Sequence, residues 1–216
     1  MVVDTLLVSI ENKFAHVFSL CSDLKEYWVQ LLEKAYAKLH GSYEAIQALS
    51  VEEILKELTG GGYVKMTYSE EEAKTQKSSN LLFKYILEGL EENKIIGCIR
   101  RVEAEDPTKL ETAEVVGTLD NHYYGIVLAK EFDLNESETV KLVKLRNPWG
   151  DWGEWSGDFC NHGEDWDRNA HIRKELFGDG SKVDKKRFFS PIEDILLYFR
   201  EFLFIQVGAM KPKTTK

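Results

Sequence analysis

Two β-prone runs separated by a short acidic loop constrain the fold of this 216-residue chain more than any other feature. The first run spans residues 122–130, and the second spans residues 139–146. The loop between them, residues 131–138, is acidic and contains Asn135, a residue type that favours turns. This arrangement predicts an antiparallel β-hairpin.

The register of that hairpin decides which side chains meet. A loop centred between residues 134 and 135 pairs Tyr124 with Leu145, and it collects a mostly apolar set of side chains on one face. The same register places His122 directly opposite Asn147. Directly opposed Cβ atoms lie about 4.5–5.5 Å apart, so the carboxamide oxygen is within hydrogen-bonding reach of the imidazole. A slip of one residue would break both the apolar face and the pair.

A histidine held by an asparagine has a specific chemistry. The asparagine oxygen fixes the tautomer and orientation of the ring, and the other ring nitrogen can then take or give a proton. This is the orienting role of the third member in Cys-His-Asn and Ser-His-Asp sites. Trp149 follows Asn147 by two residues and could shield the hydrogen bond from water. A His–Asn pair in a hairpin is more often an ordinary polar pair, so this geometry by itself assigns no catalytic role.

Helical segments precede and follow the predicted hairpin. Apolar residues at 3–4 spacing from Leu24 to Leu39 predict a helix with one buried face, which Asp23 caps and Gly41 ends. Residues 69–77 are expected to form a polar loop. Further helices are expected to start at Ser50, at Ser79 or Asn80, and at Ser190, with additional strands over residues 94–102 and 202–207. Helices followed by mostly antiparallel strands indicate the α+β class.

Charge and composition narrow the classes of function. Lys and Arg number 28 against 37 Asp and Glu, and the net charge of −9 argues against a nucleic-acid partner, which needs a basic face. No apolar stretch is long enough for a membrane span. Met1 to Asp4 lacks the basic region of a signal peptide, and three scattered cysteines fit a reducing compartment. We therefore expect a cytoplasmic location.

Several motifs in chain order resemble the calpain family of cysteine proteases. Residues 142–150, which end in Asn-Pro-Trp-Gly, and the Glu-Trp-Ser-Gly of residues 154–157 carry the strongest similarity. Residues 27–45 are similar to the long helix of the family, and Thr59-Gly60-Gly61 is similar to its helix-ending turn. His122 and Tyr124 match the Gly-His-Ala-Tyr of the family, although Asn121 stands in place of the glycine. The similarity runs from about Cys21 to Val207.

The resemblance implies a papain-like protease core of two subdomains, of which the first carries the nucleophilic cysteine and the second carries histidine and asparagine. This chain resembles the second: a papain-like C-terminal lobe of antiparallel sheets flanked by helices. Residues 1–20 are then a linking segment, residues 21–209 the subdomain, and residues 210–216 a tail. The implied partners are the Cys-bearing subdomain of the same protein and a peptide substrate.

The cysteines present do not resemble the nucleophile of the family. Cys21, Cys98 and Cys160 all lack the Gly-x-Cys-Trp signature, and Cys98 lies within an apolar strand. The resemblance therefore implies a chain inactive by itself, in which His122 would be the base, Asn147 would orient it and Trp149 would cover the pair. The alternative is a binding or regulatory module of a calpain-like protein that has lost activity. A structural scaffold is a third, more remote class.

Metal binding is the last expectation. The resemblance implies calcium ligands in two loops of the second subdomain, and Glu154 aligns with the first carboxylate. Asn161 stands near an expected Asp, and Lys185, Lys186 and Arg187 occupy the second turn. Three cations repel a divalent ion, so we expect no metal or other cofactor in this chain. Asp179 and Asp184 are a weak alternative pair of calcium ligands.

One further cluster of polar residues could suggest a zinc site. Cys160, His162, Asp165 and Asp167 lie close together in the sequence. Their spacing matches no common zinc pattern. A solvated acidic loop is therefore the favoured interpretation of this segment.

Overall fold

The computed structural model describes most of the chain, with gaps in the loops and at both ends. The described residues are 8–9, 15–16, 19, 21, 23, 25–47, 49–101, 114–115, 117–119, 121–147, 155–178 and 186–208. Their contacts divide the chain into two compact units, Met1–Ile54 and Leu55–Lys216. This division by contacts does not test the expected parts 1–20 and 21–209, and the predicted tail 210–216 lies outside the described residues. The assignment of these parts to family subdomains stays a prediction.

The first unit is built around one long helix. Its elements are β1 (Val8–Ser9), β2 (Ala15–His16), α1 (Trp28–His40), α2 (Tyr43–Gln47) and the start of α3 (Val51–Thr59). The predicted stop is confirmed, because Gly41 follows α1 with a φ of 106°. The predicted start is wrong: the Asp23 carboxylate accepts a hydrogen bond from the Lys25 amide in a turn, and the helix begins only at Trp28.

The predicted buried face of α1 is only partly buried. Tyr36 and Ala37 are buried, but Trp28 is 61% exposed and Leu39 is 72% exposed. Periodicity identifies an apolar stripe, whereas burial also needs a packing partner, and within its unit α1 packs mainly against α2. Both ends of α3 are as expected. Ser50 and Glu53 form a reciprocal capping box, and Gly60 follows the helix with a φ of 65°.

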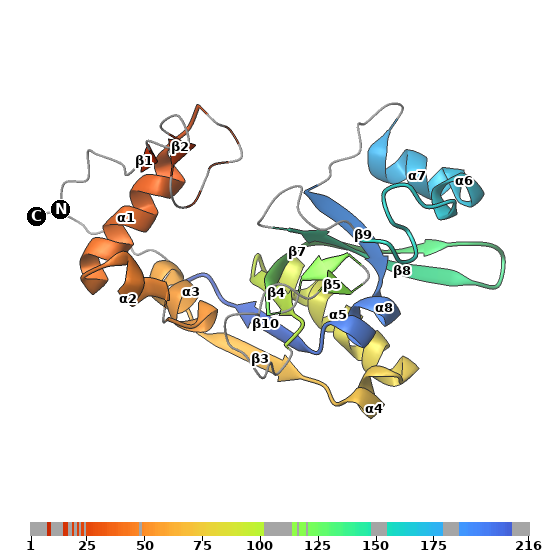
Figure 1. Cartoon of the computed structure of the whole chain (residues 1–216). Coiled ribbons are helices and arrows are strands. Elements are labelled where there is room, and N and C mark those ends of the chain that lie inside the picture. Colours follow the sequence, from red (N-terminus) through yellow and green to blue (C-terminus); the bar gives the residue numbers. More distant parts are fainter. Residues whose placement is uncertain are drawn as a thin grey trace, which may run out of the picture. The chain divides into compact units, whose positions relative to one another are not determined.

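The second unit contains a six-stranded antiparallel sheet in the order β3-β10-β4-β7-β8-β9. Figure 1 shows this sheet with helices on both sides. The strands are β3 (Tyr63–Thr67), β4 (Ile95–Ile99), β7 (Tyr123–Asp133), β8 (Thr139–Arg146), β9 (Arg187–Pro191) and β10 (Glu201–Ile205), with a separate pair β5 (Glu114–Val115) and β6 (Thr118–Leu119). The helices are α4 (Glu70–Ala73), α5 (Gln76–Glu91), α6 (Asp165–Arg168), α7 (Ala170–Phe177) and α8 (Ile192–Tyr198). The predicted α+β class is confirmed.

Three local predictions in this unit are wrong. The expected loop at residues 69–77 contains α4, because Ser69 and Glu72 form a capping box. The next helix starts before Ser79, since Thr75 caps it by accepting a hydrogen bond from the Ser78 amide. Helix α8 begins after Pro191 rather than after Ser190, because β9 continues through Pro191 by pairing with β8.

The hairpin forms where it was predicted, but its register differs. Ile126 pairs with Leu145, two positions away from the predicted partner, and a β-bulge between Ile126 and Leu128 shifts the register once more. The cause is the loop, which occupies residues 134–138 and is closed by the Asn135 carboxamide oxygen accepting the amides of Ser137 and Glu138. The loop is centred on residue 136 rather than between residues 134 and 135, and this displaces the point about which the two strands pair.

The sheet separates two hydrophobic clusters. The face covered by α5 and α8, here called the helix-covered face, carries Tyr124, Ile126, Leu145 and Phe188 in the larger cluster. The opposite face carries a smaller cluster under α6 and α7, with members Phe132, Val140, Leu142, Trp166, Ile172 and Phe189. The bulge changes which residues of β7 point to each face, so one strand contributes to both clusters. Among the described residues, no helix is both long and apolar enough to cross a membrane.

Candidate active site

His122 and Asn147 lie at the same end of the sheet. His122 immediately precedes β7, and Asn147 immediately follows β8. Both side chains are buried, with 7% of His122 and 2% of Asn147 exposed, and they are hydrogen-bonded to each other. The structure therefore brings together the two residues that the sequence singled out.

The pair meets even though the predicted register is wrong. Extending the observed pairing of Gly125 with Arg146 by one rung places Asn147 opposite Tyr124, so His122 is its diagonal neighbour. A shift of two positions leaves every side chain on its original face, because side chains alternate with a period of two. Tyr124, Asn147 and His122 thus remain on one side of the sheet.

Burial and hydrogen bonding act in opposite directions on the His122 imidazole. Burial is the larger influence and lowers its pKa below the ordinary value of 6.5, because the charged ring is poorly solvated. The hydrogen bond with Asn147 opposes this by favouring the protonated ring. The net result is a ring that is neutral at physiological pH and can accept a proton.

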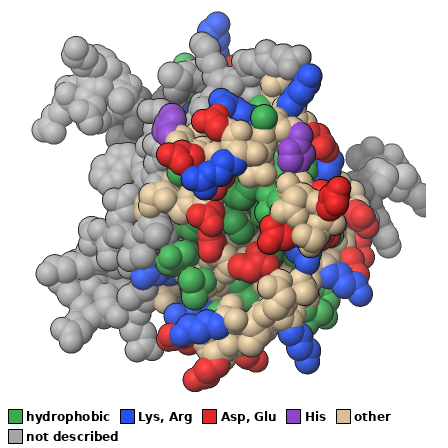
Figure 2. All heavy atoms as spheres, turned by 90° about the vertical axis from the view of Figure 1, so that its right-hand side faces the viewer, with side chains coloured by type: hydrophobic (Ala, Val, Ile, Leu, Met, Phe, Trp, Pro, Cys, Tyr) green, Lys and Arg blue, Asp and Glu red, His purple; other side chains and the backbone are tan. Residues whose placement is uncertain are grey.

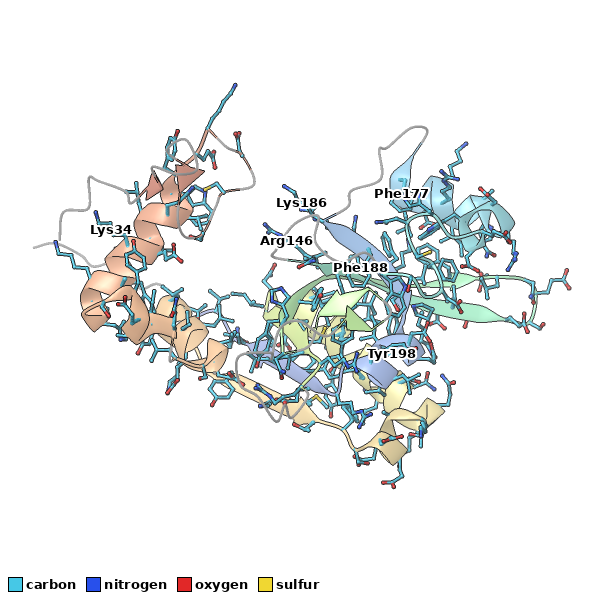
Figure 3. The ribbon with its side chains drawn as sticks, viewed as in Figure 1. Lys34, Arg146, Phe177, Lys186, Phe188 and Tyr198 are labelled. Atoms are coloured by element: carbon cyan, nitrogen blue, oxygen red, sulfur yellow. The ribbon has the colours of Figure 1, made fainter. Side chains whose placement is uncertain are left out.

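Aromatic packing fixes the position of the imidazole. The Tyr124 ring meets His122 edge to face, with 5.2 Å between centroids and an interplanar angle of 87°. Tyr124 is itself held between Phe188 and Phe199, at centroid distances of 6.0 and 5.4 Å. Figure 3 shows Phe188 lying along β9. The ring of His122 thus lies against the larger hydrophobic cluster through Tyr124.

Two backbone hydrogen bonds hold the chain on each side of the pair. The Asn147 amide donates to the Lys186 carbonyl at 2.9 Å, which extends the pairing of β8 with β9 beyond Arg146. The Asn121 amide donates to the Arg100 carbonyl at 2.7 Å. These two hydrogen bonds therefore hold the backbone of Asn121 and Asn147, which lie close to the ends of β7 and β8.

Asn121 is a positioning residue that the sequence reasoning missed. Its φ is 54°, in the left-handed region that glycine and asparagine adopt most readily. The substitution of Asn121 for the glycine expected from the resemblance was the signal, because both residue types tolerate this conformation. The left-handed turn directs the chain into His122 and β7.

Trp149, the predicted cover of the pair, lies outside the described residues, so that prediction stays untested. Trp155 is described and belongs to the core: its ring stacks on Phe188 at 5.8 Å, and its Nε1 donates to the Asp158 carbonyl at 2.8 Å. A Cβ on Gly157 would approach Trp155 Cζ2 to 2.3 Å. The glycine of the Glu-Trp-Ser-Gly motif is thus required for packing against the indole.

Of the three cysteines, Cys98 lies in an environment unlike that of a thiolate nucleophile. Cys98 is fully buried in the larger cluster, and burial raises the pKa of its thiol. Cys21 is buried and donates to Gln30 Oε1 at 3.4 Å, and Cys160 is half-buried in a loop before α6. A reactive cysteine needs an electropositive, accessible site that stabilises the thiolate. Cys98 is therefore a core residue, as its sequence context predicted.

The described part of the expected calcium site does not fit a divalent cation. Lys186 immediately precedes β9 and accepts the Asn147 amide, and Arg187, the first residue of β9, pairs directly with Arg146. Among the described residues, no group of three His, Cys, Asp or Glu side chains is placed to hold a metal. Glu154, Asp179, Asp184 and Lys185 lie outside those residues, so the expectation of no metal stays a prediction. In the segment that could suggest zinc, Asp167 pairs with Arg173, and the Asp165 carboxylate accepts the Phe159 amide.

A pocket of about 540 Å³ lies elsewhere on the unit. Its walls come from β3, α5 and β10 and include Tyr63, Tyr85 and Phe204. It opens near the start of β4, at the end of the sheet away from His122. The pocket is therefore separate from the His–Asn pair.

Comparisons with known proteins identify the family of the chain. The family model described as calpain family cysteine protease matches residues 1–206. The calpain-1 catalytic subunits of Rattus norvegicus and Homo sapiens are each 30% identical to the chain over 217 residues, covering all of the chain and 28% of each relative. Calpain-B of Drosophila melanogaster is 31% identical over 202 residues, which is 92% of the chain and 20% of that protein. The chain belongs to the calpain family of cysteine proteases.

Proposed function

We propose that this chain supplies the histidine and asparagine of a calpain-type cysteine endopeptidase, with His122 as the acid–base residue and Asn147 as its positioning residue. The observation that carries the proposal is the buried hydrogen bond between these two side chains at one end of the sheet. Such a pair is the part of a cysteine protease that activates a thiol.

In this proposal the cysteine comes from a separate subdomain. The neutral imidazole of His122 takes the thiol proton, and the thiolate sulfur attacks the peptide carbonyl carbon. The imidazolium then returns the proton to the leaving amine as the carbon–nitrogen bond breaks, which leaves a thioester on the cysteine. Water, deprotonated by the same imidazole, hydrolyses that thioester and releases the acid and the free thiol.

Asn147 makes this proton transfer efficient by holding one tautomer of His122. Tyr124 limits rotation of the ring, and the backbone bond to Lys186 limits movement of Asn147 itself. Trp149, two residues later in the sequence, is proposed to exclude water from the hydrogen bond. A chain with such a pair but without the nucleophile would not cleave peptides by itself.

We also infer a cytoplasmic location, from the use of cysteine.

The test is complementation. The full chain is mixed with the separately produced Cys-bearing subdomain of a calpain-1 catalytic subunit, and hydrolysis of a fluorogenic peptide is followed. Turnover is expected with the wild-type chain, and His122→Ala should reduce it at least about a hundredfold, since an acid–base residue contributes about 10²–10⁴. His171→Ala is the control, because that ring contacts the Asp133 carbonyl near the hairpin loop.

The regulatory-module alternative gives a different result. A dead protease module would bind the Cys-bearing subdomain, as seen by calorimetry, without any turnover. Equal activity of the wild-type chain and His122→Ala would also overturn the proposed role of His122. Loss of activity in His171→Ala alone would assign the chemistry to a different histidine.

A further inference from the structure

The pocket of about 540 Å³ lies where the six-stranded sheet extends beyond its helical cover. Strand β3 is an edge strand, and among the described strands it pairs with β10 alone. Helix α5 packs mainly over β4 and β7, which lie further into the sheet. We call the cavity beside this helix the β3–α5 pocket, and its described walls include Tyr63, Val64, Tyr85, Glu88 and Phe204.

One row of paired residues shows where the helical cover ends. Val64 of β3 pairs with Phe204 of β10, and Phe204 pairs in turn with Ile96 of β4. Phe204 and Ile96 are buried in the larger cluster on the helix-covered face, whereas Val64 is 62% exposed. Gly89 lets α5 lie close to the buried pair, because a Cβ there would approach Ile96 Cδ1 to 2.9 Å. The helix therefore covers the inner part of the row and leaves its outer end in the wall of the pocket.

Most of the described walls are apolar or aromatic. Tyr63 and Tyr85 are exposed, and Met66 packs against the larger cluster. Within the described part of the chain, no lysine or arginine lies over the ring of either tyrosine. Cavities of about 300–1,000 Å³ with mostly apolar walls and a few polar groups are typical ligand sites, and a tyrosine ring can bind a cation.

The charged groups of the pocket are mainly acidic. Glu88 and Glu92 lie one turn apart at the C-terminal end of α5, and the last turn of that helix has no basic residue. The carbonyl end of the helix adds partial negative charge at the same place. Lys94 pairs with Glu92 at 2.6 Å, whereas the Glu88 carboxylate lies 3.7 Å from Lys84 and is half exposed. Glu88 can therefore bind a second cation.

The balance of charge differs on the face around α6 and α7. Figure 2 shows acidic and basic side chains interspersed on that face. Its ion pairs are close: Arg168 lies 2.7 Å from Glu164, and Arg173 lies 3.1 Å from Asp167. In the β3–α5 pocket two carboxylates face one cation among the described lining residues. The pocket thus complements a ligand that is both apolar and cationic.

The edge of β3 favours a peptide as that ligand. The Gln206 amide donates to the Gly62 carbonyl, and the Tyr68 amide donates to the Arg200 carbonyl, both at 2.9 Å. Hydrogen-bonded positions alternate along an antiparallel pair, so the amide and the carbonyl of Tyr63 point away from β10. An extended peptide can pair with such outward groups, as in strand addition at other sheet edges.

We propose that the β3–α5 pocket is a docking site for an extended segment of a bound protein that carries an apolar and a basic side chain two positions apart. Side chains at this spacing lie on the same face of an extended strand. The apolar side chain packs beside Val64, and the basic one reaches Glu88. The pocket lies at the end of the sheet away from His122, so binding can be measured without turnover.

The test measures binding to the full chain by fluorescence anisotropy, with three labelled peptides of equal length. The probe carries Leu and Arg two positions apart in a sequence that is otherwise Ser and Thr. One control peptide has Gln in place of Arg, and the other has Ser in place of Leu. The probe is expected to bind at least about tenfold more tightly than either control, and added salt should weaken its binding.

Two pairs of acid variants separate the pocket from the overall charge of the protein. Glu88→Gln with Glu92→Gln should remove the preference for the peptide that contains Arg. Glu71→Gln with Glu136→Gln, at exposed positions outside the described walls of the pocket, changes the net charge equally and should leave the preference intact.

A glycine variant tests the space in the pocket without changing any charge. Gly62 lines the pocket two positions before Val64, and a Cβ built on it would meet no atom within 4 Å. Gly62→Leu should fill the pocket and weaken probe binding about tenfold, whereas Gly62→Ala should weaken it less than about threefold. Circular dichroism checks that each variant is folded, and the glycine variants test the proposal even where the acid variants fail to fold.

Several results would overturn the proposal. Equal binding of the three peptides would show that the site does not select the apolar–basic pattern. Probe binding that is unchanged in both Glu88→Gln with Glu92→Gln and Gly62→Leu would place the binding elsewhere. Displacement by free arginine amide as effective as by unlabelled probe would indicate a site for small cations. Binding that appears only after residues 210–216 are removed would show that this basic segment of the chain, rather than a partner, occupies the pocket.

Discussion

At the scale of single residues, the site depends on opposing influences on one imidazole. Burial lowers the pKa of His122, and the hydrogen bond to Asn147 raises it. Because the folded-state pKa lies below the ordinary 6.5, the unfolded chain binds the proton more readily, and stability falls as the pH drops through that value. The pair is thus neutral and intact at physiological pH.

Removal of the Asn147 side chain should lower the pKa of the His122 imidazole. In Asn147→Ala burial acts without the opposing hydrogen bond, so the pKa of His122 should fall further. The measurement is an NMR titration of the imidazole protons, with His171 as the internal control because it contacts Asp133 instead. A raised pKa of His122 in the variant would contradict this account of the site.

Asp194 provides a second pH prediction with the opposite sign. Burial, followed by the charges of Asp158 and Glu193, raises the pKa of its carboxyl to about 6 from an ordinary 3.8. The folded state then holds the proton more tightly, so this contribution to stability is present below about pH 4 and is lost as the pH rises through about 6.

Asp194→Asn should therefore stabilise the protein at pH 7. After allowance for solvent screening, the gain is about 1 kcal/mol, or roughly 2–4 °C in Tm. Thermal unfolding followed by circular dichroism at pH 7 and at pH 4 measures the difference. The advantage should shrink at the lower pH, and a gain that is equal at both pH values would refute the titration as its cause.

At the scale of elements, the junction between α3 and β3 depends on close approach of two backbones. A Cβ on Gly61 would come within 1.5 Å of the Gln206 carbonyl oxygen, whereas one on Gly62 would meet nothing within 4 Å. The Gly62 carbonyl accepts the Gln206 amide, and the Thr59 carbonyl accepts the Gly208 amide. The chain after β10 is thereby held against the end of α3.

Gly61→Ala should separate these segments, and Gly62→Ala is its matched control. We expect Gly61→Ala to cost about 1–3 kcal/mol of unfolding free energy, as for other overpacked positions, and Gly62→Ala to cost less than about 1 kcal/mol. Urea denaturation measures both values. Equal stability of the two variants would show that the backbones can move apart without cost.

At the scale of the whole molecule, the two compact units differ in how much core they contain. Both hydrophobic clusters, including all the residues that support His122, lie within residues 55–216. Among the described residues of the first unit, few apolar side chains are buried, and Trp28 and Leu39 of α1 are exposed. The stability of the site should therefore come from the second unit.

A fragment of residues 50–216, which retains the Ser50 cap of α3, tests this expectation. It should unfold cooperatively, with a Tm within a few degrees of the full chain, and should keep the low pKa of His122. Circular dichroism and the same NMR titration provide the readouts. Non-cooperative melting of the fragment would show that the first unit is needed to complete the core.

The sequence by itself determined the elements that depend on nearby residues. The capping box of Ser50 and Glu53, the turn after Thr59 and the two strands of the hairpin follow from local patterns. It also determined that His122 and Asn147 share one side of the sheet, because alternation along a strand survives a shift of two positions. Helix capping, turn formation and strand alternation depend on residues close together in the sequence, so these features could be predicted.

Only the tertiary structure decided what depends on contacts between distant segments. The bulge after Ile126, the continuation of β9 through Pro191 and the exposure of Trp28 each arise from pairing or packing partners far along the chain. These arrangements depend on contacts between segments that are far apart in the sequence. The local residue pattern does not determine which segments pair or pack together.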